Sequence, residues 1–328
     1  MILRILLVVS LLIVLALGGL WLFGPREPID LTVRFDPGEI GSDPDQYLAR
    51  TEADIPNLRP QSAKEIVWAY PTSRAKTPIS IVYIHGFSAD KAELRPLPDK
   101  VATELGANLF YTRLSGHGRD GAAMEQTSVN DWVNDLAEAI AIGRAIGTRV
   151  VVIAASTGGT LATLGTTSPD MMEDVEGLVL VSPNFALQDR WAFVLDLPFA
   201  RDLLPIVGGE TYSFEPRSER QAEHWTTQYP ITALAPMAAL VRAVRRADIS
   251  AARPIPLLVL YSQEDTVVDP AATERFVANW PGPHEAVTVP LTGDPSNHTI
   301  AGDILSPATT DELAERITNW IKGLQPAS

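Results

Sequence analysis

A serine stands in a stretch whose residue types favour nucleophilic chemistry. Val150 to Ala154 form a continuous apolar, mostly β-branched run, which is typical of a strand buried on both faces of a parallel sheet. The small residues on either side of Ser156 let the chain turn sharply from this strand into a helix. Such a turn holds the Ser156 hydroxyl above the carboxyl end of the sheet. It also places the Thr157 N–H at a helix N-terminus, where a developing negative charge is stabilised.

Two later loops carry the side chains that such a serine needs. A hydroxyl becomes a good nucleophile only when a base removes its proton, and that base needs a carboxylate to fix its tautomer. Asp265 and His298 each lie in a loop that follows a predicted strand. The chain order serine, acid, histidine is the one that a strand–turn–helix nucleophile requires. The sequence therefore predicts a triad of Ser156, Asp265 and His298, with Glu264 and Asp269 as neighbouring acids.

The elements that must position these side chains alternate between strand and helix. Helical stretches are predicted at 98–105, between 128 and 147, behind Ser156, at 271–280 and from 307 onward. Strands are predicted at 65–70, 79–84, 108–112, 150–154, 177–182, 255–261 and 285–291. This alternation indicates an α/β fold with a mostly parallel, doubly wound sheet and crossover helices.

The alternation is interrupted once, between about 187 and 250, where the pattern is helical and irregular. We interpret this segment as a helical cap inserted over the carboxyl ends of the strands, where insertions often line a site. Extra packing helices are the alternative. The predicted organisation is an anchor at 1–24, a linker and irregular lead-in at 25–64, a core at 65–186 and 251–328, and the cap at 187–250.

The N-terminal segment is long and apolar enough to cross a membrane, because 5–23 is a run without a charged side chain. The run ends in bulky residues around Trp21 and not in an Ala-x-Ala-like exit, which favours an uncleaved transmembrane helix over a cleaved signal peptide. Arg4 and the α-amino group precede the run, and Arg26 follows it. This one-charge excess favours a single-pass protein with its N-terminus inside and its domain on the periplasmic or extracellular side.

Composition excludes several classes of function. The 328 residues carry 26 Lys and Arg against 40 Asp and Glu, a net charge of -14, so nucleic acid is not expected as a partner. The absence of cysteine excludes thiol catalysis, disulfides and cysteine-ligated metal. The five histidines include no His-x-x-x-His pair, and no metal or cofactor is expected.

Short motifs at five separate places share the pattern of one known family. Ala154 to Gly158 is similar to the nucleophile elbow Gly-x-Ser-x-Gly, with alanine in place of the first glycine. His85-Gly86-Phe87 resembles an oxyanion loop, and Leu114 to Gly118 resembles a Gly-His-Gly loop. Asp265 and His298 fall at the positions of the acid and the base. From about residue 65 to the C-terminus the chain resembles the α/β-hydrolases, specifically their capped carboxylesterase and monoacylglycerol-lipase-like branch.

The resemblance implies roles for individual groups. The Phe87 N–H is expected to join the Thr157 N–H in binding the oxyanion. In the family the acid precedes a short apolar pair, which Val267-Val268 matches, so Asp265 is favoured and Asp269 is the main alternative.

The other histidines are expected to serve structure. His85 supports the oxyanion loop, and His117 belongs to a glycine turn. His284 precedes its strand, at the far end of the sheet. His224 lies in the predicted cap, where it either touches substrate or, more simply, is a solvated surface residue.

The predicted function is a serine hydrolase that cleaves small hydrophobic carboxylic esters, with short to medium acyl chains or monoacylglycerol-like lipids, through an acyl-enzyme. Two alternatives remain open. A peptidase-like member of the same fold would share the triad. A membrane-tethered binding or sensor protein would keep the hydrolase scaffold with slow turnover.

Overall fold

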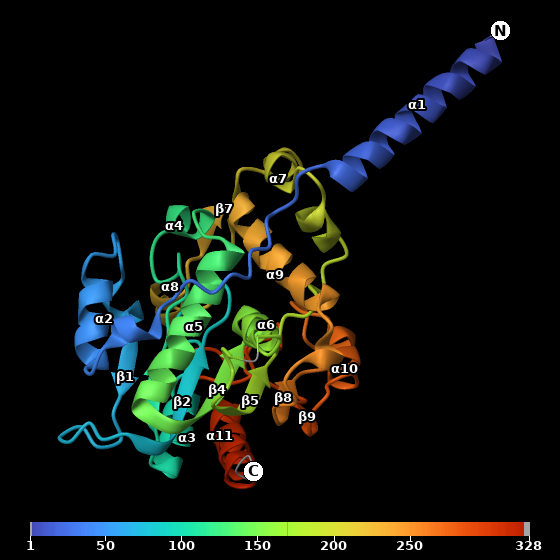
Figure 1. Ribbon diagram of the computed structural model, residues 1–328. Coiled ribbons are helices and arrows are strands. Elements are labelled where there is room, and N and C mark those ends of the chain that lie inside the picture. The colour runs from blue at the N-terminus through green and yellow to red at the C-terminus, as the bar shows by residue number, and fades with distance from the viewer. Residues whose placement is uncertain (1, 169, 325–328) are drawn as a thin grey trace.

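The computed structural model describes residues 2–168 and 170–324, and its centre is a seven-stranded sheet (Figure 1). The strand order is β1-β3-β2-β4-β5-β8-β9; β1 pairs antiparallel with β3, and all the other pairs are parallel. The strands are β1 (Glu65–Val67), β2 (Thr77–Ile84), β3 (Asn108–Tyr111), β4 (Gly147–Ala155), β5 (Val175–Val181), β8 (Leu257–Tyr261) and β9 (His284–Thr288). This is the mostly parallel α/β arrangement that the alternation predicted, and it is the fold that the resemblance to the α/β-hydrolases implied.

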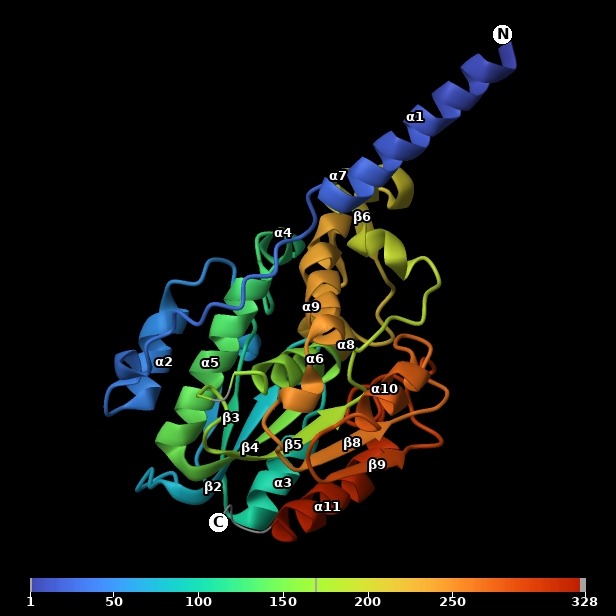
Figure 2. The ribbon, with the colours of Figure 1, turned by 45° about the vertical axis from the view of Figure 1, so that its right-hand side comes forward.

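Helices cover both faces of the sheet (Figures 1 and 2). They are α3 (Leu97–Leu105) and α11 (Pro307–Lys322) on one face, and α5 (Val129–Ile146) and α6 (Ser156–Gly165) on the other, with α4 (Gly121–Glu125) and α10 (Pro270–Val277) at the periphery. Alternate strand residues serve the two cores: Tyr83 and Ile153 pack with α3 and α11, whereas Ile84 and Val152 pack with Trp132 of α5. Burial on both faces explains why β4 is continuously apolar from Val150 to Ala155.

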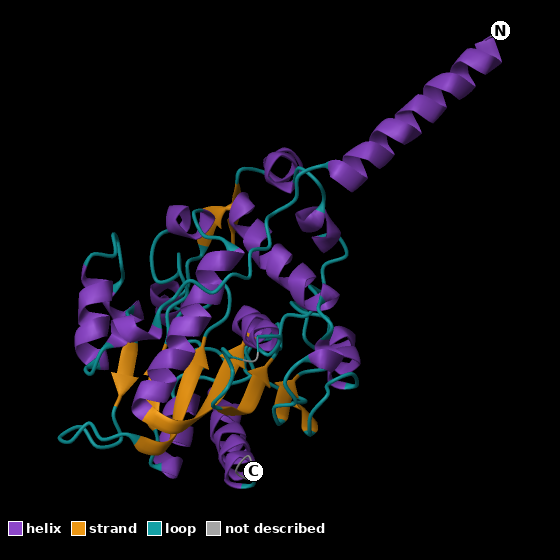
Figure 3. Cartoon of the chain, in the orientation of Figure 1, coloured by secondary structure: helices purple, strands orange, loops and turns teal. Residues whose placement is uncertain are grey.

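The segment between β5 and β8, which we call the insertion (187–250), lies beyond the carboxyl ends of the strands (Figure 3). It holds the 3-10 turns η3 (Ala192–Asp196), η4 (Ile231–Ala233) and η5 (Ile249–Ala251), the helices α7 (Ala200–Gly208), α8 (Glu219–His224) and α9 (Leu234–Arg246), and the short antiparallel strands β6 (Thr211–Ser213) and β7 (Gln228–Pro230). The two strands are a difference from the helical and irregular segment that the sequence predicts. They are three residues each and are stabilised by a stacked pair of rings, Tyr212 and Tyr229, which no periodicity reveals.

The lead-in before β1 is more ordered than its composition indicates. It contains α2 (Pro44–Ala53) between the 3-10 turns η1 (Pro37–Ile40) and η2 (Pro60–Ser62). Asp43 caps α2 by accepting from the Gln46 N–H, and Pro44 follows at the first helical position, a start signal that a search for apolar period alone misses. The buried Tyr47 of α2 then donates a hydrogen bond to Glu138 of α5, so the lead-in is fixed to the core.

The N-terminal helix α1 (Ile2–Phe23) projects away from the domain (Figure 1). Its stretch Arg4–Phe23 has a mean hydropathy of 2.8 and none of it is buried, so it is long and apolar enough to cross a membrane, as signal sequences also are. The residues that follow α1 pack on the insertion. The Phe199 N–H donates to the Pro25 carbonyl at 2.7 Å, and Arg201 forms a two-pronged ion pair with Glu27.

Candidate active site

Ser156 occupies a strained turn between β4 and α6. Its φ of 46° lies in the left-handed region, which costs a non-glycine residue energy and aims the side chain out of the sheet. Gly158 makes this turn sterically feasible, because a Cβ there would stand 2.6 Å from the carbonyl oxygens of both Ile84 and His85. Ala154 is fully buried within the sheet, paired with neighbouring strands on both sides. The elbow therefore requires glycine on its helix side, whereas the strand side accommodates a methyl group.

The structure brings the three predicted side chains into one hydrogen-bonded chain. His298 Nε2 lies 3.0 Å from Ser156 Oγ, and His298 Nδ1 lies 2.8 Å from Asp265 Oδ2. In the tautomer with its proton on Nδ1, the imidazole donates to the carboxylate and accepts from the serine hydroxyl. Asp265 is 2% exposed and Ser156 is 8% exposed, so little water competes for these contacts.

Asp265, and not Asp269, faces the histidine. The second oxygen of Asp265 accepts from the N–H groups of Val267 and Val268, at 2.8 and 3.0 Å, which fixes the carboxylate plane. Asp269 instead caps α10 through the Ala271 N–H and forms an ion pair with Arg275. The apolar pair that marks the acid in the sequence thus supplies the two N–H groups that orient it.

Asp294 holds the loop that carries the histidine. Its Oδ2 accepts from the backbone N–H groups of His298 and Thr299, at 3.2 and 3.0 Å, and its Oδ1 accepts from that of Ser296. Burial alone would raise the pKa of Asp294, but the hydrogen bond from the Ser296 hydroxyl and those from the backbone N–H groups outweigh it, and the pKa is lowered. Sequence reasoning did not single out Asp294; its only local signal is the Asp-Pro-Ser turn in which it stands.

The surroundings of His298 favour the protonated, positively charged form of its imidazole. Burial would lower the pKa of His298, but the hydrogen bond and the charge of Asp265 outweigh it, so the pKa is raised above its ordinary value. Glu93 and Asp294 add to this effect from further away. The histidine is therefore a stronger base than a free imidazole, and it is protonated at a higher pH.

Two backbone N–H groups lie beside the serine. Thr157 is in the first turn of α6, whose N–H groups have no partner within the helix. The Phe87 N–H follows Gly86 in the loop after β2 and donates no hydrogen bond within the described residues. A Cβ on Gly86 would lie 3.1 Å from the Ser156 Cβ, so this loop passes directly over Ser156. The Phe87 ring packs edge-on against His117 and Tyr229, which fixes the loop backbone.

A buried carboxyl group that the sequence did not single out supports the same loop. Glu93 Oε2 accepts from the Gly86 N–H at 2.7 Å and from the Tyr83 hydroxyl at 3.0 Å. Burial raises the pKa of Glu93, and the Gly86 N–H and the nearby His298 offset this only in part. Glu93 is thus a fixed support behind the loop after β2 and a source of negative potential near the imidazole.

The remaining histidines lie outside the hydrogen-bonded chain. His85 donates to the Gly86 carbonyl and accepts from the Leu114 N–H, and burial lowers its pKa to about 4, so it is a neutral brace. His117 is fully buried against it, with ring centroids 5.0 Å apart, and His284 is exposed at the start of β9.

His224 differs from the expectation of a solvated residue. Its Nδ1 lies 2.9 Å from the buried carboxylate of Asp90, and the nearby Thr226 N–H donates to the Ser88 carbonyl at 2.7 Å. Both contacts join the insertion to the loop that follows Phe87. A histidine in an irregular segment carries no pattern that would reveal such a partner.

No group of three or more metal-ligating side chains is positioned to hold an ion anywhere in 2–168 or 170–324. The site therefore consists of a buried hydroxyl, imidazole and carboxylate in a row, next to backbone donors. Such a set can move a proton from the hydroxyl to the imidazole and stabilise negative charge on an adjacent oxygen.

Comparisons with known proteins find lipolytic enzymes among the proteins that this chain resembles. A curated relative, the thermostable monoacylglycerol lipase of a Bacillus strain, is 31% identical over 93 residues, which is 28% of this chain and 37% of the relative. A metagenome-derived lipolytic enzyme has a TM-score of 0.65 at 17% identity, over 81% of this chain and 99% of that chain. A soluble variant of the monoglyceride lipase of Saccharomyces cerevisiae, solved with a substrate analogue, has a TM-score of 0.62 at 14% identity, over 81% and 92%.

The two solved structures establish the similarity of fold alone, and the curated relative is matched over little more than a third of its length. The model of the family described as serine aminopeptidase, S33, matches residues 76–290, from the second strand of the sheet to the loop before His298. Because this match spans more than half of the chain, the protein belongs to the serine aminopeptidase (S33) family of α/β-hydrolases.

Proposed function

We propose that this protein is a serine hydrolase that cleaves carboxylic esters with hydrophobic acyl groups through an acyl-enzyme. The observation that carries the proposal is the hydrogen-bonded chain from Asp265 through His298 to Ser156. Family membership and the lipase relative support hydrolysis of an ester or lipid in general. The nucleophile and the acyl-enzyme are our inference from the geometry.

In the first half-reaction, Ser156 Oγ forms a bond to the ester carbonyl carbon while its proton passes to His298 Nε2. The carbonyl oxygen becomes an oxyanion and accepts hydrogen bonds from the Phe87 and Thr157 N–H groups. The ester C–O bond then breaks, and the leaving alcohol takes the proton from His298. Asp265 stays ionised and stabilises the imidazolium during this step.

In the second half-reaction, water replaces the alcohol. His298 takes a proton from the water as it attacks the acyl carbon, and returns it to Ser156 Oγ when the acyl–oxygen bond breaks. The products are a carboxylic acid and free enzyme. Because His298 must be neutral to begin each half-reaction, the rate falls as pH drops through its raised pKa.

The proposed substrate class follows from the surroundings of the site. The insertion lies beyond the carboxyl ends of the strands, where the serine stands, and its Tyr229 ring packs against Phe87 beside that serine. It is joined to the oxyanion loop through His224 and Thr226. Apolar rings next to the serine favour an acyl chain of short to medium length, or a monoacylglycerol-like lipid.

We also propose that α1 is retained as a membrane anchor. Contacts of Pro25 and Glu27 fix the segment after α1 to the insertion, so the domain lies close to the end of the helix and is not connected to it by a flexible linker. If the helix is an anchor, the protein stays in the membrane fraction after carbonate washing and leaves it only with detergent. Recovery of a soluble mature chain that begins after residue 24 would identify α1 as a cleaved signal.

The function is tested with full-length protein, a series of p-nitrophenyl esters of increasing acyl length, and an aminoacyl p-nitroanilide. We expect turnover of the esters by the wild type and none by Ser156→Ala, with an unchanged melting temperature. Ester turnover that survives in Ser156→Ala refutes the proposal. Faster turnover of the anilide would favour a peptidase. Labelling by a fluorophosphonate without repeated turnover would favour a binding or sensor protein.

A further inference from the structure

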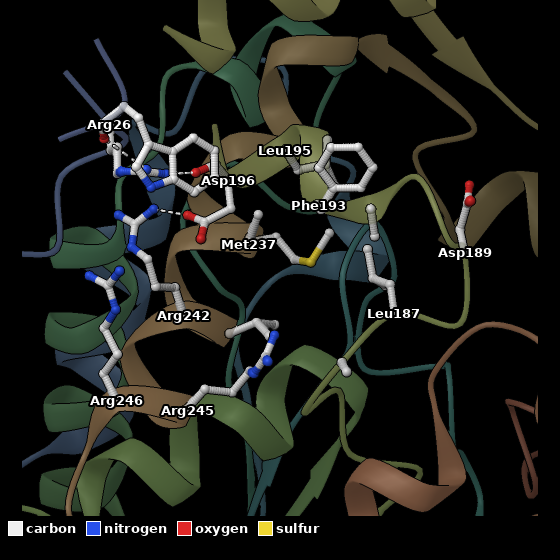
Figure 4. Close-up of a pocket in the computed structure, with 15 residues that line it drawn as sticks. Arg26, Leu187, Asp189, Phe193, Leu195, Asp196, Met237, Arg242, Arg245 and Arg246 are labelled. Atoms are coloured by element: carbon white, nitrogen blue, oxygen red, sulfur yellow. Dashed lines mark hydrogen bonds and ion pairs between the residues drawn. The ribbon is translucent and has the colours of Figure 1, made fainter. Parts of the chain in front are cut away.

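A cavity of about 540 Å³ lies between the end of α1, the turn η3 and the helix α9 (Figure 4). The residues that line it do not include Ser156 or His298. It is nevertheless close to the nucleophile, because Met237 lines the cavity and its sulfur lies 3.2 Å from the side chain of Asn184. The N–H of Asn184 in turn donates to the Ser156 carbonyl. The cavity is therefore a separate space, one layer of side chains away from the ester site.

The cavity gathers positive charge in a chain that is otherwise strongly acidic. Four arginines line it, Arg26, Arg242, Arg245 and Arg246, against a net charge of -14 for the whole protein. Figure 4 shows the guanidinium groups of Arg26, Arg242 and Arg246 together on one side of the cavity, with the Arg245 side chain turned away from them. Each guanidinium group is planar and can bind a phosphate or carboxylate through two parallel hydrogen bonds, so this cluster of arginines favours an anionic ligand.

The acidic residues of the lining neutralise only part of this charge. Asp196 forms an ion pair with Arg242, and Asp189 accepts from the Trp191 N–H in a local turn. Arg245 and Arg246 are exposed, and neither forms an ion pair within the part of the chain that the structure describes. Two guanidinium groups thus remain available to an anion at the cavity rim.

The opposite wall is apolar. Leu187, Phe193 and Leu195 lie across the cavity from the arginines (Figure 4), and Phe193 is 57% exposed. A small anion would gain nothing from contact with the apolar wall, and a neutral apolar molecule would gain nothing from contact with the arginines. The combination fits an amphiphile that has a negative head and a hydrocarbon tail.

The position of the cavity indicates where this amphiphile comes from. Trp21, near the end of α1, and Arg26, just after it, form part of the lining. Arg26 also donates to the Trp21 and Asp196 carbonyls, so the end of the apolar helix and the cavity are one continuous structure. Trp and Arg at the end of a spanning helix lie at the level of lipid head groups.

We propose that this cavity binds an anionic phospholipid of the membrane in which α1 is embedded, with its negative head group on the arginine side of the lining and an acyl chain along Phe193 and Leu187. This inference rests on the proposed anchor role of α1 and does not depend on the ester chemistry. The bound lipid joins the insertion to the membrane surface and fixes how the domain is oriented above it. Basic clusters next to a membrane helix recognise anionic lipid in this way.

The test uses the full-length protein in nanodiscs that contain equal amounts of phosphatidylcholine and phosphatidylglycerol, and native mass spectrometry counts the lipids that stay bound. We expect phosphatidylglycerol to be retained well above its share in the disc. The variant Arg245→Gln with Arg246→Gln should lower its occupancy by roughly tenfold. The matched control is Arg220→Gln with Lys322→Gln, which removes the same charge from exposed positions outside the cavity and should change nothing.

Further arms separate the alternatives. Phe193→Ala should also lower the occupancy, and added inorganic phosphate should not displace the lipid. Equal retention of the two lipids by the wild type refutes the proposal, and this result needs no variant to fold. Full displacement by phosphate alone refutes it as well, because the cavity would then be a simple anion site.

Turnover of a soluble p-nitrophenyl ester is recorded on the same samples. Wild-type protein that retains phosphatidylglycerol but cleaves no ester would refute the proposed function and leave the lipid site standing. Ester cleavage without lipid selectivity would do the opposite.

Discussion

Replacement of Asp265 by asparagine tests the catalytic geometry most sharply, because the structure dictates how the new side chain must lie. The Val267 and Val268 N–H groups point at one oxygen of the carboxylate. An asparagine must place its carbonyl oxygen there and turn its NH₂ group toward His298. The imidazole then has to accept at Nδ1 and carry its proton on Nε2, which faces Ser156 as a donor and not as a base.

The expected loss follows from this wrong tautomer and from the missing charge beside the imidazolium. In serine hydrolases generally, such a change lowers kcat on the order of 10⁴-fold, about 5.5 kcal/mol of transition-state stabilisation. We therefore expect Asp265→Asn to retain a small fraction of wild-type turnover of a p-nitrophenyl ester. The pH profile should change as well. Asp265 raises the pKa of His298 against the lowering effect of burial, so the acid limb of the residual activity should move to lower pH.

Asp269→Asn is the matched control. This neighbouring carboxylate caps α10 and pairs with Arg275, so its loss should cost at most about 1 kcal/mol of folding stability and leave ester turnover near wild type. The reasoning is refuted if Asp265→Asn retains turnover within about tenfold of wild type. It is equally refuted if the Asp269 variant is the one that loses activity.

Three further predictions follow from single contacts. Gly158→Ala should destabilise the fold by about 1–3 kcal/mol, because its Cβ would stand 2.6 Å from two backbone oxygens. Gly159→Ala should cost less, because its Cβ would stand 3.2 Å from a proline side chain. Thermal melts compare the two variants, and equal costs would contradict the elbow geometry. Glu93→Gln keeps an acceptor for the Gly86 N–H of the oxyanion loop but removes a negative charge near His298. We therefore expect kcat to fall more than KM changes, and the acid limb of the pH profile to move to lower pH. An unmoved pH profile would count against an electrostatic role of Glu93. Asp294→Ala should lower kcat by freeing the His298 loop while Ser156 stays in place, and slower fluorophosphonate labelling measures this; labelling at the wild-type rate would show that the loop does not need it.

Much of the fold is visible in the sequence because both faces of the sheet are buried. The strand predicted at 150–154 is continuously apolar, and in the structure it runs from Gly147 to Ala155, a few residues longer than predicted. The strand predicted at 285–291 ends three residues early, at Thr288, before Pro290. The helix α2 and the strands β6 and β7 were missed because capping and a ring stack, not periodicity, stabilise them.

The site divides in the same way. Ser156, Asp265 and His298 each follow a strand, so chain order and loop position are enough to single them out. Glu93 could not be found in this manner, because it acts through the N–H of Gly86, and only the three-dimensional path of the loop brings the two together. The pairing of His224 with Asp90 spans 134 residues and has no local signal at all.

The most direct test of the central claim is to trap the nucleophile. Full-length protein is treated with a fluorophosphonate, its intact mass is measured, and the modified residue is located by peptide sequencing. We predict a single adduct on Ser156 that forms in the wild type and is nearly abolished in His298→Ala. An adduct on another serine, or labelling of His298→Ala at the wild-type rate, would contradict the account.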